Sequence, residues 1–171
     1  RRPRRRSVHR PRMDWIEELR ILPGVLYAMA LGGAIGFERE LKDRPAGFRT
    51  HMLVAGTAAL LLGLGRMVLE GGPSSGAALQ IDPLRLVEAV VAGVSFIGAG
   101  TIFASRDGER VQGITTAASL LTVAAIGITV GLRYHLLGLA ITLLTLAVLG
   151  LLRAFERRAK RTLERDGGKD A

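Results

Sequence analysis

Cysteine is absent from this sequence, and aromatic residues make up only 5% of its 171 positions. The absence of cysteine excludes a disulfide scaffold and a thiolate metal site. A soluble core of this size normally uses more Phe, Tyr and Trp to fill its volume. The chain is instead 49% hydrophobic, with 22 glycines and a mean hydropathy of +0.29. An excess of Leu, Ala, Val and Gly is typical of helices that pack closely in lipid.

The net charge of +9 is unevenly placed along the chain. Residues 1–12, "RRPRRRSVHRPR", hold seven arginines and no acid, and subtracting seven from nine leaves +2 for the remainder. A basic tail can bind nucleic acid or anionic lipid. Because "MDWIEELR" from Met13 resembles a natural start, we instead expect this tail not to be native. We therefore assign it no function and expect no nucleic-acid partner.

Five long apolar segments dominate the rest of the chain. A helix needs about 20 apolar residues to cross a bilayer, within a range of about 17–25. The sequence predicts an all-α, polytopic membrane protein with five transmembrane helices, because only helices satisfy the backbone of a single segment in lipid. A soluble domain this small could not bury five helices that are apolar all round. The predicted spans cover about residues 21–37, 50–69, 86–105, 113–132 and 134–152.

The connections between these segments agree with five spans. "GGPSSGAALQIDP" is a Gly/Ser/Pro loop in which Asp82 is a good N-cap and Pro83 suits the first helical position. Only Arg133 separates the last two spans, which predicts a tight antiparallel hairpin. The five-helix domain is expected to occupy residues 13–153, followed by a charged cytoplasmic tail over residues 154–171.

The orientation follows from Lys and Arg near the membrane ends. One side holds 13 of them, in the first loop, the third loop and the C-terminal tail, and the other side holds four. If the basic tail is counted, the second side holds 11 Lys and Arg residues against 13, and the difference between the two sides is small. With a start at Met13, the count predicts a cytoplasmic C terminus in a bacterial inner membrane.

Three stretches resemble a known family: "GGAIGFERELKDRPAGFRTHMLVAGTAALL", "DPLRLVEAVVAGVSFIGAGTIF" and "VQGITTAASLLTVAAIGITVGLRYH". Their order and spacing are similar to those of the MgtC/SapB membrane-protein family, over about residues 24–135. The chain departs from residues common in the family at four positions: Phe48, Glu88, Gln112 and Leu121. The resemblance implies five spans, and the count of apolar stretches between charges gives the same number separately. The resemblance is to the short members, and we expect the soluble C-terminal domain of longer members to have no counterpart in this protein.

Arg66 and Glu88 are the only full charges inside the apolar segments. Charges within a membrane are costly and usually face a protein interior. The two residues lie at similar depths in adjacent spans, which predicts an intramembrane ion pair between them. Two alternatives remain open from the sequence: shallow interfacial positions with Arg66 snorkelling to the headgroups, and an ion site. Glu88 also shares a small, polar helix face with Ala92, Ser95 and Ala99.

Small residues recur along three of the predicted spans and indicate close helix contacts. Whether these contacts lie within one chain or join subunits of a homo-oligomer is left open by the sequence. The glycines expected to pack are Gly32, Gly36, Gly98, Gly100, Gly127 and Gly131.

The first loop, "ERELKDRPAGFRTH", is a candidate cytoplasmic recognition surface, and its alternative is a solvated turn that sets topology. Pro45 and Gly47 favour a defined turn. We expect an ion-pair network between arginines and acids that flank it. The candidate surface residues are Glu38, Arg39, Glu40, Arg44 and Arg49.

Enzyme motifs such as G-x-S-x-G, H-E-x-x-H and the P-loop are missing, and the histidines (His9, His51, His135) are scattered. We therefore expect no catalytic residue, no cofactor and no bound metal. The resemblance implies a link to magnesium and ion homeostasis, since longer family members regulate other membrane proteins, the ATP synthase among them. The predicted function is a non-enzymatic inner-membrane protein that contacts the lipid bilayer and other membrane proteins in ion homeostasis or stress. The alternative is a small Mg2+ transporter or channel. A single acid within the spans is a poor basis for a transport route, because magnesium sites use carboxylates together with waters.

Overall fold

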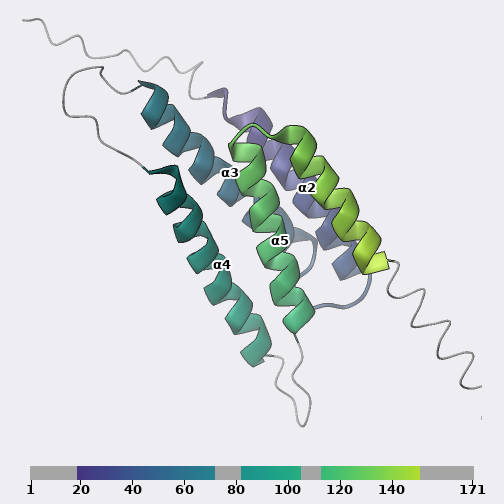
Figure 1. The fold of residues 1–171 in the computed structure, drawn as a ribbon. Coiled ribbons are helices and arrows are strands. Elements are labelled where there is room, and N and C mark those ends of the chain that lie inside the picture. The colour runs from purple at the N-terminus through teal and green to yellow at the C-terminus, as the bar shows by residue number, and fades with distance from the viewer. Residues whose placement is uncertain (1–18, 72–81, 105–112, 151–171) are drawn as a thin grey trace, which may run out of the picture.

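The computed structural model describes residues 19–71, 82–104 and 113–150, and these ranges are almost entirely helical. The helices are α2 (Leu22–Glu40), α3 (Phe48–Gly71), α4 (Pro83–Ala104), α5 (Ile114–Gly131) and a last helix, His135–Gly150, which has no label in Figure 1. The all-α fold is confirmed for this part of the chain, and each predicted apolar segment coincides with one helix. The predicted tails, residues 1–12 and 154–171, lie outside the described residues.

The helix ends follow local sequence signals. The Asp82 carboxylate accepts a hydrogen bond from the Leu84 amide at 2.9 Å, so Asp82 caps α4 as the sequence predicts. Helix α2 extends past its predicted end at residue 37 to Glu40, and Arg39 lies in its last turn. A cation is favourable there because the helix macrodipole is negative at its C-terminus.

Three of the helices are long and apolar enough to cross a membrane, judged by length and composition: Phe48–Glu70, Leu84–Ile102 and Ile114–Gly131. Helix α2 does not meet this measure, because its last turn carries Glu38, Arg39 and Glu40. The last helix is also shorter over its described part. The structure thus supports a membrane protein, whereas five crossings remain a prediction.

The core lies where α3 and α5 pack together, with α2 on one side and α4 on the other. One apolar cluster joins α2, α3 and α5, around Ile35, Ala59 and Ile126. A second joins α3, α4 and α5, around Leu62, Val94 and Leu120. Figure 1 shows α4 at one edge of the bundle, with α2 and the last helix at the opposite edge.

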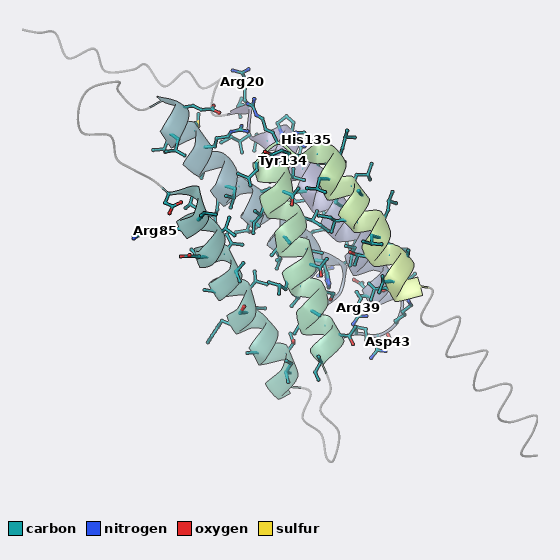
Figure 2. All side chains as sticks on the ribbon, in the orientation of Figure 1. Arg20, Arg39, Asp43, Arg85, Tyr134 and His135 are labelled. Carbon is teal, nitrogen blue, oxygen red and sulfur yellow. The ribbon has the colours of Figure 1, made fainter. Side chains whose placement is uncertain are left out.

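The predicted hairpin between the last two spans is a tight turn. The amides of Arg133 and Tyr134 donate to the carbonyls of Val130 and Thr129 at 2.8 and 3.0 Å. Arg133 has a φ of 69°, in the left-handed region that favours glycine. This turn lies at the same end of the bundle as the start of α2, and the loop between α2 and α3 lies at the other end (Figure 2).

Candidate functional site

A buried polar cluster lies at the end of the bundle where α2 gives way to α3. It consists of Arg39 on α2, His51 on α3, and Thr116 and Ser119 on α5, and each of these side chains is buried. Buried polar groups are costly unless they are hydrogen-bonded. Here Arg39 Nη2 donates to Thr116 Oγ1 at 3.2 Å, so the guanidinium of one helix is tied to the hydroxyl of another.

His51 links the loop to α5. Its Nδ1 lies 2.9 Å from the Gly47 carbonyl, and its Nε2 lies 3.0 Å from Ser119 Oγ. Because a carbonyl oxygen only accepts, Nδ1 carries a proton and donates to Gly47, while Nε2 is hydrogen-bonded to the Ser119 hydroxyl. That hydroxyl also donates to the Thr116 carbonyl at 2.8 Å. The network fixes the start of α3 against α5.

Glycines make this close approach possible. A Cβ at Gly36 would lie 2.8 Å from both His51 Cβ and Phe48 Cα, and a Cβ at Gly32 would lie 2.6 Å from the His51 carbonyl oxygen. Real Cβ atoms do not approach so closely, so α2 and α3 could not pack in this way with larger residues. The predicted packing role of these two glycines therefore has a direct geometric basis.

Three of the other predicted packing glycines also permit close contacts, and one does not. A Cβ at Gly131 would lie 2.7 Å from Leu62 Cβ, and one at Gly127 would overlap the Ala55 carbonyl oxygen, so both permit contact between α5 and α3. A Cβ at Gly98 would lie 3.3 Å from the Ala117 Cβ, a tight contact between α4 and α5. A Cβ at Gly100 would meet nothing within 4 Å, so Gly100 makes no close contact with another described helix.

The predicted loop surface is corrected at Arg39. This side chain is 1% exposed and reaches inward to α5, so it belongs to the buried polar cluster. The physical reason is the helical period, since Arg39 lies three residues after the buried Gly36 and shares its face. Arg44 and Arg49 are exposed, as a recognition surface requires.

The two glutamates of the loop make local contacts. Glu38 forms an ion pair with Lys42, one turn further along the chain. Glu40 Oε2 accepts a hydrogen bond from the Phe48 amide at 2.7 Å and so supplies one of the orphan donors at the start of α3 with a partner. The loop thus closes on itself, and it is held in place by the cluster beneath it.

The structure does not bring Arg66 and Glu88 together. Arg66 Nε lies 3.3 Å from Glu70 Oε1, one turn along the same helix. On α4, Leu86 and Val90 are among the residues that pack against α3. Glu88 is two residues from each, about 200° around a helix, and it is exposed. The prediction considered only the depth of the two residues in the membrane. It did not consider the direction in which each side chain points from its helix.

The face of α4 that carries Glu88 is exposed along its length. Glu88, Ala92, Ser95 and Ala99 are all exposed, as their shared helical face requires. Only 17% of the α4 span is buried, against 39% for α3 and 50% for α5. This stripe (the Glu88 face) is small and polar, and its residues are exposed along the described helix.

Sequence reasoning did not single out His51, Thr116 or Ser119 as site residues. The available signal was spacing, since Thr116 and Ser119 lie three residues apart and share a helix face. Among the residues that the structure describes, no three His, Cys, Asp or Glu side chains come together as a metal site would need. The described side chains of the cluster form hydrogen bonds between helices.

Comparisons with known proteins identify relatives of the chain. The profile of the MgtC family matches residues 25–158. The chain is 40% identical to "Protein MgtC" of Brucella abortus over 126 residues, which cover 74% of this chain and 48% of that protein. It is 39% identical to "Protein SrpB" of Synechococcus elongatus over 155 residues, covering 87% and 82%.

A third relative is the "Putative magnesium transporter YhiD" of Escherichia coli K12, 38% identical over 128 residues that cover 73% of this chain and 56% of that protein. The chain spans less than two thirds of the length of the first curated relatives that it matches. No solved structure matches it. The family profile extends over most of the chain and includes both the buried polar cluster and the Glu88 face, so the protein belongs to the MgtC family.

Proposed function

We propose that this protein is a non-enzymatic, five-span protein of the bacterial inner membrane that regulates other membrane proteins by direct contact. Its setting is ion homeostasis or stress, its C terminus is cytoplasmic, and α4 is its contact helix. The observation that carries the proposal is the Glu88 face, which places an exposed acid in an apolar helix whose other charged residue is Arg85 in the first turn. No described residue forms an ion pair with Glu88.

Contact with the lipid bilayer is energetically unfavourable for this face. Ionisable side chains in a spanning helix cost about 2.5–3.5 kcal/mol at its centre and are almost always turned toward protein or water. Glu88 lies in the second turn of α4, where the cost is smaller and still unfavourable. Small residues on the same stripe allow a partner helix to approach closely. A partner that offers a hydrogen-bond donor to Glu88 would relieve the cost.

The packing of α4 against α3 also supports the proposal. These helices share less contact than the other neighbouring pairs, and an apolar cavity of about 340 Å3 lies between them, lined by residues such as Thr57, Ala58, Val90 and Gly93. Helix α4 is therefore held mainly by α5. An edge helix with one firm neighbour can present its outer face without disturbing the core.

A small magnesium transporter is the second candidate, and the printed name of the Escherichia coli relative favours it. A transport route needs polar groups near the midplane. In the described residues several threonine hydroxyls donate to carbonyls of their own helices, as Thr122 and Thr129 do on α5 and Thr142 does on the last helix. These groups serve structure, which favours the contact hypothesis.

Site-directed crosslinking tests the contact hypothesis, and the absence of native cysteine means that only the introduced position carries the probe. A photoreactive probe on Ala92→Cys would label the partner from within the Glu88 face in native membranes. Ala34→Cys on the exposed side of α2 is the matched control. We expect a discrete adduct at residue 92 and none at residue 34.

The adduct should disappear when Ser95 and Ala99 are both replaced by leucine, because the larger side chains block close approach. Adducts of equal yield at both probe positions, or an adduct that survives the two leucines, would contradict the proposal. An adduct with a second copy of the chain would assign the Glu88 face to a homo-oligomer and remove the support for contact with other proteins.

A further inference from the structure

An open cavity of about 590 Å3 lies at the end of the bundle opposite the buried polar cluster. Its volume falls in the range of small-molecule sites, about 300–1,000 Å3. Three arginines line it, Arg20 before α2, Arg66 on α3 and Arg133 in the turn after α5. Among the described residues, no Asp or Glu lines it. The other lining residues are mostly apolar or small, including Val25 and Gly63.

The walls of this cavity are held by specific contacts. Tyr27 Oη donates to the His135 carbonyl at 3.3 Å, and the two rings meet edge to face with centroids 5.6 Å apart. These contacts join α2 to the start of the last helix. Arg66 is oriented by Glu70, which lies at its Nε. The two terminal nitrogens of a guanidinium carry four further N–H donors, and the contact with Glu70 uses none of these four.

Arg133 is an unusual residue for its place. Its φ of 69° is a conformation that glycine adopts at no steric cost and that other residues adopt rarely. The turn after α5 would form more easily with glycine, yet the chain has an arginine there, on the cavity wall. An observed backbone outlier of this kind points to a functional constraint.

We propose that this cavity binds the phosphate group of an anionic phospholipid. Guanidinium groups bind phosphate through paired hydrogen bonds, and three of them line one cavity. Phosphate could also come from a soluble phosphate ester. The apolar part of the lining favours the lipid, because it offers acyl chains a surface where α2, α3 and α5 leave the membrane. This inference goes beyond the proposed contact function and uses different residues.

Lipid binding to the purified full-length chain tests the proposal. Native mass spectrometry in detergent would compare phosphatidylglycerol with phosphatidylcholine, which carries the same phosphate beside a compensating cation. We expect phosphatidylglycerol to bind at least about tenfold more tightly. Each arginine near the membrane surface contributes about fivefold in affinity, so Arg66→Gln and Arg133→Gly should each weaken binding by about that factor.

Arg85→Gln is the matched control, because Arg85 is an exposed arginine at the start of α4 and lies outside the cavity (Figure 2). The affinity of this variant should stay within about twofold of the native value, since it keeps all three cavity arginines. Arg133→Gly separates binding from folding, since glycine suits the positive φ and should leave thermal stability unchanged or raised.

A competition arm distinguishes the two sources of phosphate. Millimolar glycerol 3-phosphate should fail to displace phosphatidylglycerol, and displacement would overturn the assignment to lipid in favour of a soluble ester. Equal binding of the two lipids would overturn the proposal altogether. So would a loss of affinity in Arg85→Gln as large as that in Arg133→Gly.

Discussion

Replacing Gly36 by alanine should loosen the contact on which the buried polar cluster depends. The new Cβ would lie 2.8 Å from Phe48 Cα and 2.9 Å from the Gly47 carbonyl oxygen, and neither backbone atom can rotate away. Overpacking of this kind costs about 1–3 kcal/mol. Alanine regains about 1 kcal/mol of helix propensity relative to glycine. The net change in the free energy of unfolding should therefore be a destabilisation of about 0–2 kcal/mol.

Gly100→Ala is the control that isolates the packing term. Its Cβ would meet nothing within 4 Å, so the propensity gain of about 1 kcal/mol should appear as a stabilisation. Unfolding of both variants by sodium dodecyl sulfate titration, followed by circular dichroism, measures the two changes under one condition. The variants should differ by about 1–3 kcal/mol. Equal stabilities would refute the idea that Gly36 permits close approach of α2 and α3.

Three further predictions concern the cluster and the topology. Thr116→Val removes one hydrogen-bond acceptor of the buried Arg39 guanidinium and should cost about 1–3 kcal/mol. The exposed neighbour Thr115→Val should change stability by less than about 0.5 kcal/mol in the same titration. A double-mutant cycle of His51→Ala and Ser119→Ala should give a coupling of about 0.5–3 kcal/mol, and additive changes would show that their 3.0 Å contact contributes nothing. Alkaline phosphatase fused to the C terminus should be inactive, because that end is expected in the cytoplasm, and strong activity would reverse the orientation.

The helices could be predicted because a membrane-spanning helix requires a long, uninterrupted apolar stretch of sequence. Uninterrupted apolar stretches of about 20 residues match the thickness of a bilayer and are uncommon in soluble helices. The capping role of Asp82 was also predictable, since its side chain acts on a residue two positions away. Local interactions of this kind depend only on nearby sequence.

The site was harder to predict because it depends on helix rotation. Arg39 looked like a loop residue, although it continues the helical face of Ile35 and Gly36 and so points inward. Glu88 was correctly assigned to a face with Ser95, and its pairing with Arg66 failed because depth alone does not fix direction. Hydrogen bonds between side chains that are 68 and 77 residues apart in sequence leave no local signal.

Magnesium flux in liposomes tests most directly the claim that this protein acts by contact rather than transport. The purified protein would be reconstituted at known density, and uptake would be followed with an internal magnesium dye across an imposed gradient. We expect no flux above that of empty vesicles, because the hydroxyls of Thr122 and Thr129 donate to carbonyls of their own helix and the described residues bring together no acidic cluster that could hold the ion. Saturable uptake that Glu88→Gln abolishes would contradict the contact hypothesis.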